Sequence, residues 1–481
     1  MFSAKTEQSA AKLVLAICAA QIVLWTLSPM VFFESPPLDV VENMVWGKEW
    51  RMGYYKHPPL QAWLSEIALT LGGGKIWAIY LLSQLCIAST FWALFLLGRD
   101  VADARTGLRA VVLFSLVYYA TIPTPEFNAN VVQMPIWAFA GWLLWRSIQN
   151  GNLAWWALLG AVLALGVYAK YSVVFLVVAL IGAGLSISAG RASLRTPGPY
   201  LASGVCFLLS APHFVWLVET GYQPINHAMR RLTSLEGFSR LLEPLKFLLS
   251  QIASHAAPIG LLLIARARFD TEQSEADERR YVDLLAILPL GSMVFYSLVT
   301  GGMLKYAWAT PAVTWISLAV AMRLPSLEQT THIRLKRGLW LFLFLIMPLA
   351  WGLASKLSEN SPRPQKTAWH GAELAELAID DWTRSVGGIP TIIAGPTWEA
   401  GLIAYFTPHR PSGFLFANFE WNPWIDQERL DREGALFVWI GPREQYDAFG
   451  PFVERSRRYV KDKDLKRIFH WAVRAPRHVK K

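Results

Sequence analysis

One segment of the chain, residues 34–75, holds the side chains that could carry chemistry. Asp39 and Glu42 are three residues apart, so one turn of helix would place both carboxylates on the same face. Cationic and histidine side chains follow in the stretch of 19 residues that begins at Asp39: Lys48, Arg51, Lys56 and His57. Carboxylates beside cations can supply a general base next to a phosphate site. A solvated loop whose charges lie near lipid headgroups explains the same spacing without chemistry.

The composition indicates what kind of chain must position this segment. Of 481 residues, 54% are hydrophobic and 17% are charged, and the mean hydropathy is +0.31, which excludes a cytosolic enzyme. The 23 Trp, 25 Phe and 15 Tyr exclude a disordered chain. The net charge of +10 is explained by cytoplasmic loops that collect Arg and Lys, so no nucleic-acid partner is predicted. Three cysteines lie in apolar stretches and are interpreted as packing residues: Cys18, Cys86 and Cys206.

Apolar runs predict an α-helical polytopic membrane protein with about eleven transmembrane helices. The runs are 13–33, 76–97, 107–122, 131–148, 154–170, 172–189, 200–217, 247–265, 281–300, 303–322 and 338–355. Arg and Lys gather in the connections 266–280 and 323–337, so the positive-inside rule predicts a cytoplasmic N-terminus. That orientation places three larger segments outside: 34–75, 218–246 and everything after about residue 356.

A change of character near residue 356 predicts two domains, 1–355 and 356–481. Pro362 and Pro364 mark a linker, residues 371–386 have the pattern of an amphipathic helix, and PTIIAG and GALFVWIG are typical of short buried strands. We therefore expect a transmembrane domain with a catalytic first outer loop, followed by a small α/β domain. The tail beyond Glu454 is basic, which suits either a solvated terminal helix or a site for anionic lipid headgroups.

The first outer loop resembles that of the polytopic type C glycosyltransferases, through an acid soon after the first span and the KHPPL element at residues 56–60. Within that group the chain is most similar to bacterial members of the protein O-mannosyltransferase superfamily, such as the lipid A aminoarabinose transferase and the rhizobial lipopolysaccharide galacturonosyltransferases. The resemblance covers roughly residues 10–325. It extends to PTPEFNANVVQMPIW, where Asn130 stands in a slot often filled by an acid, to GVYAKYS with Lys170, and to GGMLKYAW with Lys305 and Trp308.

The resemblance implies an inverting transfer in which Asp39 deprotonates the acceptor hydroxyl while a polyprenyl phosphate leaves. It assigns a second, catalytic or orienting, carboxylate to Glu42. It implies donor-phosphate contacts for four cations: Arg51, Lys56, Lys170 and Lys305. The side chains expected to contact acceptor or sugar are His57, Tyr54, Tyr55, Asn130 and Trp308. Because no acid stands at position 130, no metal ligands are assigned, and a divalent metal cofactor is possible without being required by the sequence.

The expected function is transfer of a sugar from a polyprenyl-phosphate donor to a lipopolysaccharide, lipid A or other glycolipid acceptor. We expect a multi-pass protein of a bacterial cell inner membrane, with its active site and C-terminal domain facing the periplasm and the lipid bilayer as a partner. Transfer to protein Ser or Thr is an alternative, since related families use the same loop. A lipid-linked sugar flippase is an alternative of another class, although no repeated pair of interrupted segments favours it.

Overall fold

The computed structural model describes residues 7–230, 237, 239–264, 266, 276–324, 333–361, 364–441, 446–459 and 468–477. The predicted inside loops 266–280 and 323–337, Pro362 of the predicted linker and the predicted basic tail lie partly or wholly outside these ranges. The chain forms two compact units. Unit 1 comprises Met1–Leu27, Lys56–Leu60 and Tyr80–Leu349, and unit 2 comprises Ser28–Tyr55, Gln61–Ile79 and Ala350–Lys481. The residues of the first outer loop are thus shared between the two units.

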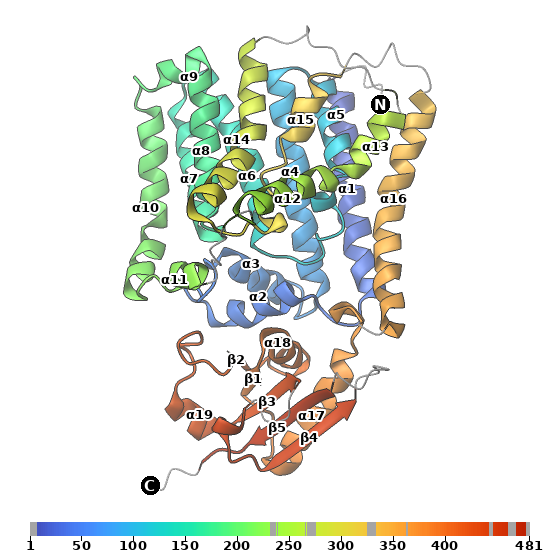
Figure 1. The fold of residues 1–481 in the computed structure, drawn as a ribbon, viewed down its shortest axis with the longest axis vertical. Helices are drawn as coiled ribbons and strands as arrows, with labels where there is room; N and C mark the ends of the chain where they lie inside the picture. Colours follow the sequence, from blue (N-terminus) through green and yellow to red (C-terminus); the bar gives the residue numbers. More distant parts are fainter. Residues whose placement is uncertain are drawn as a thin grey trace. The chain divides into compact units, whose positions relative to one another are not determined.

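Unit 1 is built from helices (Figure 1). Its helices, three of which also contribute residues to unit 2, are α1 (Glu7–Phe32), α4 (Trp77–Val101), α5 (Ala104–Phe114), α6 (Ala129–Asn150), α7 (Leu153–Ala169), α8 (Val173–Ser186), α9 (Ser188–Ser193), α10 (Gly198–Glu219), α11 (Gln223–Arg230), α12 (Ser239–Ser254), α13 (Ala256–Ile264), α14 (Ala276–Thr300), α15 (Ile316–Ala321) and α16 (Ile333–Leu357). Two short 3-10 turns, η1 (Tyr118–Ala120) and η2 (Tyr306–Ala309), lie in its connections.

Five helices in the described ranges are long and apolar enough to cross a membrane, or six when the bent pair α12 and α13 counts as one span. The five are α1, α4, α10, α14 and α16, at the positions of five predicted runs. The predicted count of eleven is not confirmed. Helices α7 and α8 have 17 and 14 residues, fewer than the roughly 20 that a bilayer requires. The runs 107–122 and 303–322 break into short helices and 3-10 turns, and α12 bends from α13 by 52°.

Small residues let the helices of unit 1 pack closely. A Cβ added at Gly98 of α4 would lie 2.7 Å from the Cα of Gly107 in α5, and one at Gly160 of α7 would lie 2.4 Å from the carbonyl oxygen of Ala202 in α10. Buried amides then tie the helices to their connections, since Gln21 Nε2 donates to Gln84 Oε1 and to the carbonyl of Ala120 at 3.1 Å each. Packing and these bonds fix the connection between α5 and α6.

Unit 2 is a small α/β domain joined by residues of the first outer loop. Its helices are α2 (Leu38–Glu49), α3 (Leu60–Leu71), α17 (Gly371–Ser385), α18 (Thr397–Phe406) and α19 (Gln427–Glu433). Its strands are β1 (Ile392–Gly395), β2 (Ser412–Leu415), β3 (Ala435–Ile440), β4 (Glu454–Tyr459) and β5 (Ile468–Arg474). The predicted helix at 371–386 and the two predicted strands are confirmed as α17, β1 and β3.

The five strands form one mixed sheet in the order β2-β1-β3-β5-β4, seen in the orange to red part of Figure 1. β1 pairs in parallel with β2 and β3, whereas β5 runs antiparallel to both β3 and β4. All four residues of the edge strand β2 are buried. Helix α2 lies against this strand, so closely that a Cβ on Gly413 would be 2.5 Å from Cγ1 of Val45. The first-loop helix therefore completes the core of unit 2.

Candidate active site

A cluster of cations surrounds His57 in unit 1. We define the cation cluster as Lys56, Lys170, His227 and Lys305, which surround His57 and come from four separate segments of the chain. Lys56 and His57 lie in the irregular stretch before α3, Lys170 is the C-cap of α7, His227 lies in α11, and Lys305 precedes η2. Desolvation lowers the pKa of His57 well below its usual value, and the charges of Lys56, Lys170, His227 and Lys305 lower it further. The structure thus brings together three lysines that the sequence predicts as phosphate contacts.

Lys170 is oriented by residues from two other segments. Its ammonium Nζ donates to Oδ1 of Asn130 at 2.7 Å and lies 5.7 Å from the centre of the Trp308 ring. Asn130 stands in the first turn of α6, where the side chain of Asn128 caps the helix by accepting from the backbone N–H of residues 130 and 131. Helix capping thus fixes the amide that orients Lys170.

Polar side chains behind Lys170 hold the turn between α7 and α8. Ser172 donates to Oε1 of Gln133 at 2.9 Å, and the Trp137 indole N–H donates to the same oxygen at 3.2 Å. The Tyr171 hydroxyl lies 3.1 Å from Nε2 of His213, which is fully buried in α10. His213 therefore supports the turn that carries Lys170.

The connection that carries Lys305 and Trp308 is held by contacts that the sequence did not reveal. The Tyr119 hydroxyl lies 2.8 Å from the carbonyl oxygen of Tyr306 and 3.0 Å from Oε1 of Gln251 in α12. Ser297 donates to the carbonyl of Gly302 at 2.6 Å. Tyr119 and Gln251 belong to no motif. His227 begins the segment HAMRRL, in which no spacing of residues singles it out.

The predicted acid pair lies at the start of α2 in unit 2. The helix begins at Leu38 after Pro37, so Asp39 is in its first turn and Glu42 is one turn further on, as the spacing predicts. Asp39 is half-buried, whereas Glu42 is 4% exposed. A carboxylate in the first turn is stabilised by the positive end of the helix dipole.

Two tyrosines that the sequence predicts as sugar contacts stack on other aromatic rings. Tyr54 and Tyr55 are each 2% exposed. Tyr54 stacks on Trp46 at a centroid distance of 5.0 Å and donates to the carbonyl of Trp46 at 2.6 Å. Tyr55 stacks on Trp421 at 4.3 Å with an interplanar angle of 1°. Because these rings pack within unit 2, we do not carry their predicted contact with a sugar into the proposal.

Arg51 is exposed, and its carbonyl accepts from the Trp63 indole at 2.9 Å.

Charged groups bind the end of α2 to the sheet of unit 2. Lys48 donates to the carbonyl of His409 at 3.0 Å and also to that of Arg410, whose guanidinium pairs with Glu66 of α3 at 2.5 Å. Desolvation raises the pKa of Glu49, while Ser412, Arg429 and Lys48 oppose the rise.

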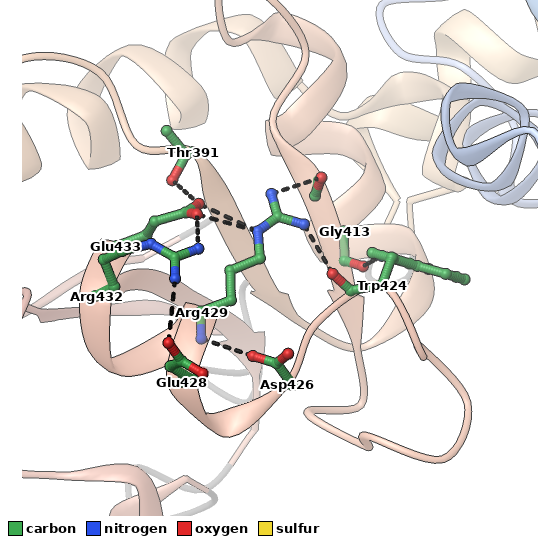
Figure 2. A network of polar contacts seen from close by, with 9 residues as sticks. Thr391, Gly413, Trp424, Asp426, Glu428, Arg429, Arg432 and Glu433 are labelled. Carbon is green, nitrogen blue, oxygen red and sulfur yellow. Dashed lines mark hydrogen bonds and ion pairs between the residues drawn. The ribbon is translucent and has the colours of Figure 1, made fainter.

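Arg429 is the centre of the network in Figure 2. Its guanidinium contacts the carbonyl of Trp424 at 2.8 Å, Oγ of Ser412 at 3.2 Å and Glu433 at 3.2 Å. Thr391, just before β1, donates to the same carboxylate at 2.9 Å. The network joins β2, α19 and the start of β1 beside the residues that hold α2.

A groove of about 620 Å³ lies between α12, α14 and α15 in unit 1. One face of α14 lines the groove, through residues 283, 286, 287, 290, 291 and 294. The walls are apolar except for Asp283 and Arg323, which form a two-pronged ion pair with distances of 2.6 and 2.8 Å. Within the described ranges, no group of three or more His, Cys, Asp or Glu side chains could hold a metal ion.

Comparison with known proteins agrees with this architecture. Residues 56–216 match the family described as dolichyl-phosphate-mannose-protein mannosyltransferase. The fold is similar to two crystal structures of ArnT from Cupriavidus metallidurans, one in the apo state with a TM-score of 0.63 and one bound to undecaprenyl phosphate with a TM-score of 0.61. Each is 14% identical to this chain, and each match covers 96% of this chain and 98% of the other. No curated protein matches the chain significantly by sequence.

The family match covers about a third of the chain, and the similarity to ArnT is one of fold. This chain is mainly helical and has a small C-terminal domain that contains a sheet.

Proposed function

We propose that this protein transfers a sugar from a polyprenyl-phosphate donor to a lipopolysaccharide, lipid A or other glycolipid acceptor on the outer face of a bacterial inner membrane. One observation carries the proposal: Lys56, Lys170 and Lys305 converge on His57 from segments far apart in the sequence. Such a cluster suits an anionic group that several cations must contact at once. The undecaprenyl phosphate bound by the similar ArnT structure supports a lipid phosphate as that group.

The cation cluster would stabilise the leaving group. When the bond between the sugar carbon and the phosphate oxygen breaks, negative charge accumulates on the polyprenyl phosphate. Cations that are already in place stabilise that charge without reorganising, an effect on the order of several kcal/mol in a poorly solvated site. Asn130 and Trp308 orient Lys170 for this role, so the site is organised before the donor arrives.

The groove between α12, α14 and α15 suits the hydrocarbon tail of the donor. It extends from Asp283 to Val294 along α14, roughly 16 Å at 1.5 Å per residue. Val294 is six residues before the end of α14, and the connection that follows carries Lys305. A polyprenyl chain in the groove would therefore lie on the same helix that leads to the phosphate site, with the Asp283–Arg323 pair at its far end.

Asp39 is the proposed general base. Its carboxylate would take the proton of the acceptor hydroxyl as that oxygen attacks the sugar carbon from the side opposite the phosphate, which inverts the configuration. The proton ends on Asp39, the sugar on the acceptor, and the electron pair of the broken bond on the phosphate oxygen. Glu42 is proposed to orient the start of α2, because its burial leaves little of it to meet a substrate.

Binding of polyprenyl phosphate to the purified protein in lipid nanodiscs tests the phosphate site. We expect Lys56→Ala and Lys305→Ala to weaken binding by about tenfold each, since each removes one charge from a site that holds an anion. Lys246→Ala is the control, because Lys246 lies on α12 and pairs with Glu243 at an exposed position. Wild-type affinity in both cluster variants would refute the site, provided that all variants unfold at the wild-type temperature.

A further inference from the structure

The backbone positions of Asn130 and Lys170, whose side chains are hydrogen-bonded, are each set by a helix end. Asn130 is held by the N-terminus of α6, and Lys170 ends α7 with an extended backbone at φ −171° and ψ 143°. One turn further along α6, Gln133 accepts from Ser172, two residues after Lys170. Two contacts between the same segments thus set the separation of the backbones that carry Asn130 and Lys170.

The chemical nature of the residue at position 130 matters because of what surrounds Lys170. An amide oxygen accepts a hydrogen bond from an ammonium group and adds no charge. A carboxylate of the same size would accept the same bond and add a negative charge within 2.7 Å of Nζ. That charge would pair with Lys170 and leave less of its positive charge for the anionic group which the cation cluster is proposed to bind.

We propose that Asn130 is a positioning residue that directs Lys170 toward the donor phosphate and, by being neutral, sets the affinity of the site for a polyprenyl phosphate. The inference rests on the proposed function. Asn130 acts through Lys170 and not as a contact of the sugar. The residue type at this position therefore controls how strongly the site prefers an anionic lipid over its neutral parent alcohol.

The test compares two substitutions of asparagine by aspartate at different positions of unit 1. Asn130→Asp should weaken binding of polyprenyl phosphate in nanodiscs by tenfold or more, since the new carboxylate pairs with Lys170 and leaves less of its positive charge for the phosphate. It should raise the KM for the donor more than it lowers kcat. Asn152→Asp is the matched control, because Asn152 is the exposed N-cap of α7, at the opposite end of that helix from Lys170, and aspartate caps a helix as well as asparagine does; it should change the affinity less than about twofold.

A double-mutant cycle separates positioning from a purely structural role. In a Lys170→Ala background, Asn130→Asp should have less than half of its effect on affinity, because the partner through which Asn130 acts is gone. If the wild type and Asn130→Asp bind polyprenyl phosphate with equal affinity, this inference is overturned while the proposed function stands. An undiminished effect of Asn130→Asp in the Lys170→Ala background would also overturn it. Wild-type protein that does not bind polyprenyl phosphate would overturn the proposed function and this inference with it.

Discussion

His57 lies among lysines as a neutral imidazole. Desolvation and the neighbouring positive charges both disfavour its protonated form, so its pKa falls well below the usual value near 6.5. A histidine in this state adds no charge to the phosphate site and does not act as an imidazolium acid at neutral pH. It can contact a substrate hydroxyl through either ring nitrogen, in keeping with the sequence prediction of an acceptor contact.

The lowered pKa of His57 predicts a pH dependence of stability. Between the folded pKa and the unfolded pKa near 6.5, the unfolded chain binds a proton that the folded protein does not. Stability is therefore retained above about pH 6.5 and lost as the pH falls below it, by about 1.4 kcal/mol for each pH unit between the two pKa values. His57→Gln should lose less stability than the wild type between pH 7 and pH 5, measured by thermal unfolding.

A control for this experiment is His409→Asn, at an exposed histidine with φ 62°, a backbone conformation that asparagine tolerates. It should keep the pH dependence of the wild type. If the unfolding temperature of His57→Gln falls with pH as steeply as that of the wild type, His57 is not the neutral group described here.

The sequence predicts Lys56, Lys170 and Lys305 as phosphate contacts because each lies in a motif of the family that the chain resembles. It could not show that Asn130 contacts Lys170, since 40 residues separate them and only the packing of α6 against α7 brings them together. His227, Tyr119 and Gln251 were missed for the same reason. The sugar contacts predicted for Tyr54 and Tyr55 stay a prediction, and their ring partners Trp46 and Trp421 could not be read from an aromatic pattern.

At the scale of elements, α2 belongs to the same unit as the C-terminal sheet. The strand β2 is an edge strand, and α2 covers it through Val45 at Gly413, while α18 approaches α2 through Val41 at Gly401. The sequence predicted β1 and β3 and indicated that a helical turn would place Asp39 and Glu42 on one face, but it did not predict β2. It could not predict that they pack together, because the residues in contact are more than 350 positions apart and glycines carry no hydrophobic signal.

Gly413→Ala tests whether this packing positions Asp39. The added Cβ would lie 2.5 Å from Cγ1 of Val45, so α2 or β2 must shift. We expect a loss of about 1–3 kcal/mol in stability, as for other overpacked cores, and a lower kcat with little change in donor affinity. Calorimetry and transfer assays on the same preparation measure both effects.

Adding Val45→Ala to Gly413→Ala removes the methyl group that causes the clash and should recover part of the kcat. Gly204→Ala is the control, since nothing lies within 4 Å of a Cβ at this position of α10. A Gly413→Ala protein with unchanged stability and kcat would show that α2 does not depend on this contact.

At the scale of the whole molecule, hydropathy predicted a polytopic membrane protein, and the helical fold confirms that class. Hydropathy could not predict how many runs are single spans. The apolar run at 247–265 contains a bend next to His255, and the runs at 107–122 and 303–322 contain 3-10 turns, none of which changes the mean hydropathy. The irregular connections are also the places where Lys305 and the capped start of α6 lie. The orientation with the first loop and the C-terminal domain outside remains a prediction.

Mass spectrometry of membrane lipids tests the central claim most directly. Cells that produce the wild-type protein are compared with cells that produce Asp39→Asn, with Asp380→Asn as the matched control, at an exposed position of α17 in the same unit. The account predicts that Asp39→Asn removes one sugar mass from lipid A, lipopolysaccharide core or another glycolipid while a polyprenyl-phosphate sugar accumulates, since a general base contributes roughly 100-fold or more to the rate. Identical lipid profiles for Asp39→Asn and the wild type, with both proteins folded in the membrane, would contradict it.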